Sequence, residues 1–190
     1  MKSIYLLLTQ TNTTLASAIR FYTKGSYSHV SMSLDENLEE LYSFSRKYTR
    51  NPFIGTFMNE DIEGGVYALK PMTQSMVLRI DVTDQQYNNV ECILTDFKEN
   101  RAKYGYSVLG LIYFMLEIPR QNDYKFTCAQ FVTFVLEEAK VTSFDTHYSF
   151  RRPDDFIERY RDHVIYEGLL KDYRREKFKQ TSERKMLLSV

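Results

Sequence analysis

The chain has 190 residues, with 25 basic and 25 acidic side chains and therefore no formal net charge at neutral pH. This length suits one domain, or one domain with a tail, and it is sufficient to bury a real core. The balanced charge gives no indication of nucleic-acid binding. The 15 Tyr and 13 Phe favour an ordered globular protein and argue against a disordered chain.

The apolar runs are too short for targeting or membrane insertion. Residues 4–8 form a run of five apolar residues with no small-residue cleavage site after it, which predicts a first strand and no signal peptide. The run at 108–115 is too short to span a bilayer. We therefore expect a cytoplasmic protein with reduced thiols and no stable membrane span. Its two cysteines, Cys92 and Cys128, lack metal-type spacing, so we expect no metal and no cofactor.

The first half of the chain predicts a strand, a helix and a hairpin. The apolar and polar patterns place these elements at residues 4–9, from Thr13 or Thr14 to about 23, and at 28–34 with 40–45. In the strand 28–34 the alternation is strict, so Val30 points to one face and His29 to the other. Residues 35–37 form the turn between the two strands of the hairpin.

The second half predicts a loop followed by strands and helices. We expect a loop at 51–65, strands at 66–69, 76–82 and 163–166, and helices at 84–103, 107–116, from 128, and at 156–160 with Pro153 in its first turn. From residue 171 the chain carries seven Lys or Arg against three Asp or Glu, which indicates a solvated or loosely docked helix. We therefore divide the chain into a domain at 1–168 and a basic tail at 169–190.

A cysteine opens one of these helices. Apolar residues follow Cys128 at +3, +4, +7, +8 and +11, which is the spacing of one helical face: Phe131, Val132, Val135, Leu136 and Ala139. Thr127 is the expected N-cap, and the positive end of a helix stabilises a thiolate. Cys128 is therefore a candidate nucleophile. The alternative is a small apolar residue that fills the interface between helix and sheet.

A thiolate of this kind needs an imidazole within hydrogen-bonding reach and a polar group that orients the ring. Of the three histidines, His29 shares the polar face of its strand with Ser31 and Ser33, which are small enough to let a helix approach. We expect the helix of Cys128 to pack on that face. His147 in a loop and His163 at a strand start lack comparable surroundings.

These two motifs resemble the circularly permuted branch of the NlpC-type papain-like superfamily. The segments are Ser28-His29-Val30-Ser31, similar to a His-Val-Gly strand, and Thr127-Cys128-Ala129-Gln130-Phe131-Val132. In the lecithin retinol acyltransferase-like enzymes of that branch the second motif reads Asn-Cys-Glu-His-Phe-Val, of which Cys, Phe and Val match. The resemblance covers roughly residues 1–167. It implies an α+β, permuted papain-like fold, with a small antiparallel sheet packed against the helix that carries the cysteine.

The third member of the site departs from the pattern of that branch. Bacterial members have a Glu in the strand after the histidine, whereas the equivalent position here is Ser43, which a three-residue turn places on the His29 face with Ser45. A register change of one residue would offer Glu40 or Tyr42. A serine orients the ring but does not stabilise its charge as a carboxylate would.

An oxyanion would be held by the backbone amide of Cys128, with Tyr104 or Tyr106 as further candidate donors.

The expected function is that of a papain-like thiol hydrolase, with Cys128, His29 and Ser43 as its site. The Cys128 thiolate would attack an amide (peptide or N-acyl) or ester carbonyl, and His29 would move the proton. The partner would be a small-molecule, peptide or lipid-like acyl substrate and no nucleic acid. Two alternatives stay open: a binding or regulatory domain of the same fold, favoured by the missing carboxylate, and a membrane-surface acyltransferase with the basic tail as its anchor. The sequence gives no indication of oligomeric state.

Overall fold

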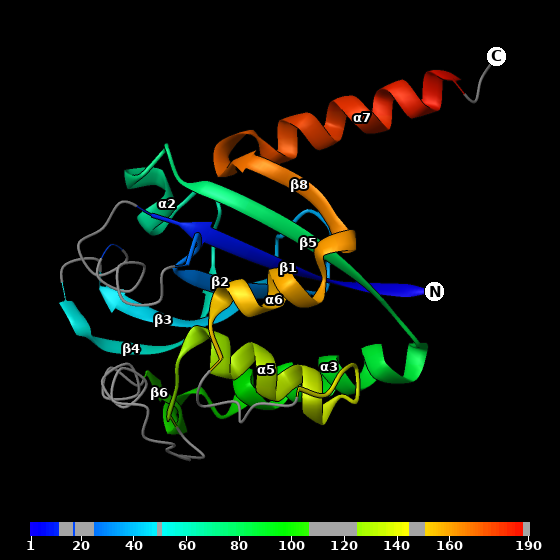
Figure 1. Cartoon of the computed structure of the whole chain (residues 1–190). Coiled ribbons are helices and arrows are strands. Elements are labelled where there is room, and N and C mark those ends of the chain that lie inside the picture. The colour runs from blue at the N-terminus through cyan, green and yellow to red at the C-terminus, as the bar shows by residue number, and fades with distance from the viewer. Residues whose placement is uncertain (12–16, 18–24, 49–50, 107–124, 145–150, 188–190) are drawn as a thin grey trace.

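A six-stranded antiparallel sheet forms the centre of the molecule (Figure 1). The computed structural model describes residues 1–11, 17, 25–48, 51–106, 125–144 and 151–187. The strand order is β4-β3-β2-β1-β5-β8, and the bounds are β1 Lys2–Gln10, β2 His29–Ser33, β3 Leu41–Tyr48, β4 Asn51–Glu60, β5 Gln74–Val82 and β8 Val164–Leu169. The expected α+β class is therefore confirmed, as is the β2–β3 hairpin.

Strand β1 is the middle of this sheet. It pairs with β2 on one side and with the whole of β5 on the other, so that Leu6 lies opposite both Met32 and Leu78. Successive side chains of a strand point to opposite faces. The run from Ile4 to Leu8 is nevertheless buried throughout, so both faces of the sheet are covered at its centre.

Three helices cover the face to which Leu6 points: α3 (Asp84–Glu99), α5 (Cys128–Glu138) and α6 (Pro153–Arg159). Figure 1 shows α3 and α5 side by side beneath the sheet, and residues of the two helices are in contact. Phe44 of β3 lies at the centre of an aromatic group on this face, with ring centroids 5.2 Å from Phe126 and 5.4 Å from Phe131. This face is the main apolar core.

The opposite face is covered by the short helix α2 (Gly65–Leu69), by a 3-10 turn (Leu170–Asp172) and by the start of α7 (Tyr173–Leu187). Leu170 and Tyr173 are 2 % exposed and belong to the second core cluster. The core therefore includes residues that lie beyond the predicted domain boundary at 168. The rest of α7, the helix expected for the tail, extends away from the sheet (Figure 1).

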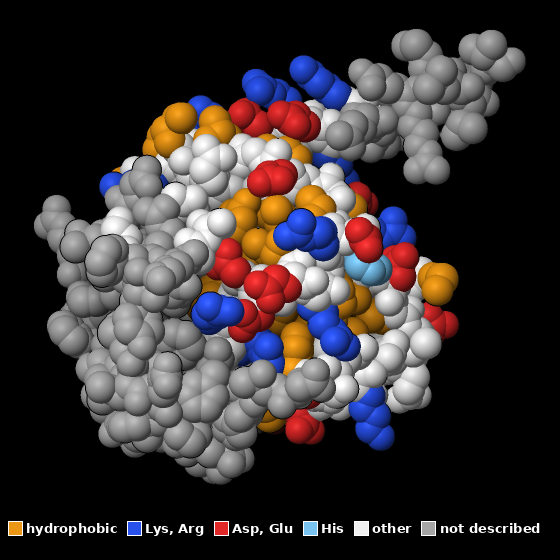
Figure 2. Space-filling model, in the orientation of Figure 1, with side chains coloured by type: hydrophobic (Ala, Val, Ile, Leu, Met, Phe, Trp, Pro, Cys, Tyr) orange, Lys and Arg blue, Asp and Glu red, His pale blue; other side chains and the backbone are white. Residues whose placement is uncertain are grey.

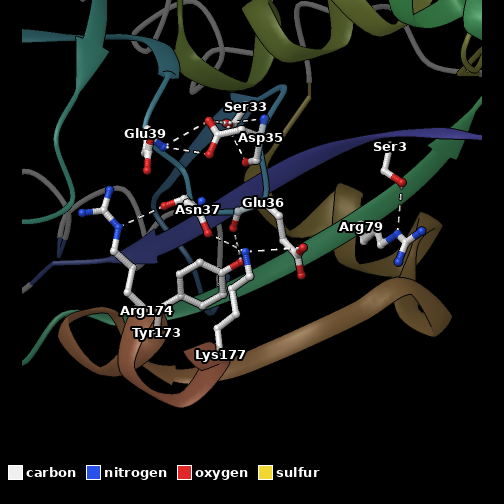
Figure 3. Close-up of polar contacts among 10 residues, drawn as sticks. All are labelled: Ser3, Ser33, Asp35, Glu36, Asn37, Glu39, Arg79, Tyr173, Arg174 and Lys177. Atoms are coloured by element: carbon white, nitrogen blue, oxygen red, sulfur yellow. Dashed lines mark hydrogen bonds and ion pairs between the residues drawn. The ribbon is translucent and has the colours of Figure 1, made fainter. Parts of the chain in front are cut away.

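Polar contacts hold the start of α7 on the hairpin turn between β2 and β3 (Figure 3). The Tyr173 hydroxyl donates to the carbonyl oxygen of Glu36 at 2.7 Å, and Arg174 Nε donates to that of Asn37 at 3.1 Å. Lys177 donates to the side-chain oxygen of Asn37 at 2.6 Å. The first turns of the tail are thus part of the folded domain.

Two segments differ from the sequence prediction. Residues 51–60, expected to be loop, form β4, which is the edge strand next to β3. Pro52 indicated a loop, but an edge strand tolerates a residue without an N–H donor. Residues 66–69, expected to be a strand, belong to α2, because Gly65 has a positive φ of 52° that turns the chain back.

Helix α3 begins after Thr83, which is its N-cap, and ends at Glu99 before a 3-10 turn at Arg101–Lys103. Residue 17 is helical, and the rest of the expected helix at 13–23, the expected helix at 107–116 and the loop with His147 lie outside the described residues. Two short parallel strands, β6 (Gly105–Tyr106) and β7 (Lys125–Phe126), lead into α5.

The surface of the described residues mixes acidic and basic side chains on the face that Figure 2 shows. Within the described ranges, no helix has the length and apolar character needed to cross a membrane.

Candidate active site

Cys128 is the first residue of helix α5. Thr127 caps the helix: its hydroxyl accepts from the Gln130 backbone N–H at 3.3 Å, and the Gln130 side chain accepts from the Thr127 backbone N–H at 2.9 Å. This reciprocal capping box fixes where the helix begins. The sulfur therefore lies at the positive end of the helix, as the sequence predicted.

Helix α5 lies on the other face of β2 from the one we expected. Its buried Phe131, Val132 and Val135 cluster with Val30 and Met32, away from the serines. The apolar stripe of the helix needs an apolar surface, which only Val30 and Met32 supply.

Cys128 still reaches His29 because each is the first residue of its element. Of the described β2 residues, only Met32 and Ser33 pair with β3, so the start of β2 lies outside that ladder. The surroundings that lower the pKa of the Cys128 thiol include the His29 side chain and the backbone amides of Val30 and Ala129. The start of the helix and the start of the strand thus meet at the thiol.

The imidazole of His29 forms an ion pair with Glu60, the last residue of β4. His29 Nε2 lies 2.8 Å from Glu60 Oε1, and the two side chains are 20 % and 9 % exposed. A carboxylate in this position orients the ring and stabilises its positive charge. The site therefore has the carboxylate that the sequence prediction lacked.

The Glu60 carboxylate accepts from donors on both of its oxygens. Oε1 accepts from His29 and from the Ser43 hydroxyl at 2.6 Å. Oε2 accepts from the Ser31 hydroxyl at 2.6 Å and from the Tyr67 hydroxyl at 3.2 Å. Four donors from two strands and one helix therefore fix the carboxylate group.

These contacts determine which nitrogen of His29 faces Glu60 and which is left for the thiol. An ionised carboxylate only accepts, so the Ser31 proton is directed at Glu60 and cannot serve His29. The Ser31 oxygen also lies 3.2 Å from His29 Nε2. Nε2–H must then be the donor to both Glu60 and Ser31, and Nδ1 is the nitrogen left for the thiol of Cys128.

The electrostatics of the three groups are consistent with a charged arrangement. Burial alone would raise the pKa of Glu60, but the attraction of His29 and the hydrogen bonds outweigh it and lower this pKa to about 2. Burial likewise lowers the pKa of His29, yet the charges of Glu60 and Cys128 raise it well above its usual value. Burial raises the pKa of the Cys128 thiol, and the attraction of His29 together with the amide donors lowers it overall.

The expected third residue, Ser43, lies on the His29 face of the sheet, as strand alternation predicted. Its hydroxyl donates to Glu60, so it supports the carboxylate, and Glu60 contacts the ring in its place. Ser45 donates to the Met58 sulfur at 3.4 Å.

The two candidates from a shifted register lie elsewhere. Glu40 forms an exposed pair with Lys98 at 3.3 Å, and Tyr42 stacks on Phe57 in the apolar core.

Of the two tyrosines named as oxyanion donors, Tyr104 makes its contacts elsewhere. The Tyr104 hydroxyl donates to Asp96 at 3.1 Å, and the ring packs on Phe97. The side chain of Tyr106 lies outside the described residues.

Glu60 and Tyr67 are the two residues that sequence reasoning missed. The signal for Glu60 was alternation counted from the buried Phe57, which puts Met58 and Glu60 on the opposite face of a strand. That signal is usable only if 51–60 is recognised as a strand. Among the described residues, no group of three or more His, Cys, Asp or Glu could hold a metal ion.

Comparison of the chain with protein-family models, with curated proteins and with solved structures finds no significant match. Any functional conclusion therefore rests on the geometry of the site.

Proposed function

We propose that the protein is a thiol hydrolase of the permuted NlpC-type papain-like kind, which cleaves an amide (peptide or N-acyl) or ester bond. The observation that carries this proposal is the ion pair of His29 with Glu60, together with the effect of the His29 and Cys128 charges on each other's pKa. These residues are a nucleophile, a base and a group that orients the base, the three parts that acyl transfer needs. The chain order, with the histidine strand before the cysteine helix, agrees with the permuted arrangement.

In the proposed reaction the Cys128 thiolate attacks the carbonyl carbon of the substrate. As the tetrahedral intermediate collapses, the bond to the leaving nitrogen or oxygen breaks, and His29 donates its Nδ1 proton to that atom. This leaves an acyl thioester on Cys128. Water then attacks the thioester, its proton passes to His29 Nδ1, and the acid and the free thiolate are released. The backbone amides at the start of α5 are the donors expected to stabilise the oxyanion.

Glu60 removes the feature that favoured a binding domain without catalysis, since that alternative depended on a missing carboxylate. The membrane-surface alternative relied on free basic residues in the tail. Two of these, Arg174 and Lys177, form ion pairs with Glu63 at 3.0 Å and Glu36 at 3.4 Å. We therefore favour the hydrolase.

The first test is the pH dependence of iodoacetamide alkylation at Cys128, read by mass spectrometry. Cys92 is exposed and free, so it serves as the internal control in the same sample. We expect the Cys128 rate to reach a plateau well below the pH at which Cys92 becomes reactive, because the thiolate is already formed. The plateau should be lost in His29→Ala and shortened in Glu60→Gln. A Cys128 that reacts as Cys92 does, whether or not His29 is present, would rule out the proposal.

The second test looks for a covalent acyl intermediate on the Cys128 thiol. Activated esters, N-acyl amides and short peptides are incubated with the protein, and the mass of the intact chain is followed. We expect an acyl adduct on Cys128 that decays in water and that does not form in Cys128→Ser or His29→Ala. A stable adduct in wild type, or equal labelling of Cys92, would contradict hydrolysis at this site.

A further inference from the structure

Tyr67 reaches the site from a turn that begins directly after Glu60. At Gly64, a Cβ atom would lie 2.5 Å from the Asp61 carboxylate oxygen, so a side chain there would collide with it. Gly65 has a φ of +52°, which favours glycine. Two glycines thus let the chain fold back through α2, which brings the buried Tyr67 ring against the sheet and its hydroxyl to Glu60 Oε2.

The direction of the hydrogen bonds around Tyr67 follows from Glu60. The ionised carboxylate only accepts, so the single proton of the Tyr67 hydroxyl is directed at it. Thr9 of β1 lies 3.3 Å from the Tyr67 oxygen. With the Tyr67 proton already used, Thr9 is the donor in that contact. The order is therefore Thr9 to Tyr67 to Glu60, and each donor in such a chain strengthens the next.

We propose that Tyr67 acts on the active site through the charge of Glu60: its hydroxyl, polarised by Thr9, draws negative charge from Glu60 and keeps the His29 imidazolium able to release its proton. This inference rests on the proposed hydrolase. A carboxylate with fewer donors binds the imidazolium proton more tightly, which weakens His29 as the acid for the leaving group. Ser31 and Ser43 still fix Glu60 without Tyr67, so the effect is on charge and not on placement.

The titratable groups around this site come from several elements. His29 of β2 and Tyr67 of α2 face Glu60, and Cys128 of α5 faces His29. Burial and the Glu60 charge raise the pKa of Tyr67 well above its usual value, so this hydroxyl stays a neutral donor. Changes in the pH profile of the site are therefore changes of the pair formed by Cys128 and His29.

The test uses the upper inflection of the Cys128 alkylation profile, where the imidazolium loses its proton and the released thiolate becomes more reactive. In Tyr67→Phe we expect this inflection to move up by about 0.3 to 1 pH unit, the size expected for one hydrogen bond. Thr9→Val should move it in the same direction by less. Ser45→Ala is the matched control, because this serine lies on the same face but donates to Met58.

The outcomes separate this inference from the proposed function. If the wild type shows no plateau, the hydrolase itself is ruled out. If the wild type shows both inflections but Tyr67→Phe leaves the upper one unchanged or lowers it, Tyr67 has only a structural role and the inference is overturned. Thermal unfolding of each variant shows that it is folded, and Thr9→Val provides an independent result should Tyr67→Phe fold poorly.

Discussion

The two faces of strand β2 differ in how they are held. Val30 and Met32 point to the apolar face, where α5 and the aromatic group around Phe44 cover them. Ser31 and Ser33 point to the other face, and Ser31 donates to the Glu60 carboxylate, whose side chain is 9 % exposed. One face is held by shape and buried area, and the other by a small number of directed hydrogen bonds around a charge.

The two faces differ in how well they tolerate substitutions. Apolar contacts are numerous and individually weak, so a core tolerates changes that conserve volume. A buried carboxylate depends on every donor, because an unmatched donor or acceptor carries its full desolvation cost. Changes on the apolar face should therefore affect stability, whereas changes on the polar face should also affect the chemistry of Cys128.

The largest effect on stability is expected on the apolar face. Phe44 is 0 % exposed and contacts several aromatic rings, so Phe44→Ala should lower the free energy of unfolding by about 3 to 5 kcal/mol. Phe44→Leu, which retains most of the volume, should cost less. Urea unfolding measures both. The alkylation profile of Cys128 should stay unchanged in Phe44→Leu, and a shift there would contradict the separation of the two faces.

A smaller loss of stability is expected for Glu60→Gln, about 2 to 4 kcal/mol near neutral pH, because the amide NH2 would face hydroxyl donors and the His29 charge would be unpaired. Ser43→Ala is the comparison variant, since it removes one donor and keeps the ion pair. It should cost less and should leave the alkylation plateau in place. Equal losses in the two variants would mean that the ion pair adds nothing to the hydrogen bonds.

The pKa shifts of Glu60 and His29 predict how the free energy of unfolding changes with pH. The pKa of Glu60 falls from an ordinary 4.5 to about 2 in the folded protein, so its contribution is present above pH 4.5 and is lost as the pH falls toward 2. His29 has a raised pKa, so its contribution is present at low pH and is lost as the pH rises through that value. The lowered pKa of Cys128 has the opposite pH dependence, so it offsets the loss from His29. In urea unfolding of the wild type, the free energy of unfolding should therefore fall from pH 4.5 to pH 3, and this fall should be smaller in Glu60→Gln.

The smallest effect is expected at the exposed ion pair between α7 and the turn after β4. Arg174 and Glu63 are 34 % and 68 % exposed, so Arg174→Ala should cost at most about 1 kcal/mol, and less at high salt. Arg175→Ala is the control, because its partner Asp172 is only three residues away. Urea unfolding at low and high salt measures both variants. A loss as large as that of Glu60→Gln would show that the tail contacts matter as much as the buried pair.

Much of the site could be predicted from local patterns. The spacing after Cys128 predicted the buried face of α5, and Thr127 predicted its first residue, because both depend on neighbours within a few residues. Strand alternation likewise placed His29 and Ser31 on one face. The expectation that α5 packs on that face was wrong, because periodicity identifies the faces of two elements and does not say which faces meet.

The sequence by itself determined that a thiol at a helix start and an imidazole on the polar face of a strand are present, together with the α+β class. Only the tertiary structure decided that Glu60, 31 residues after His29, is the partner of its ring. That pairing depends on β4 joining the edge of the sheet and on α2 folding back to bring Tyr67 over the carboxylate. Contacts between distant segments depend on strand order and register, which no local pattern of side chains specifies.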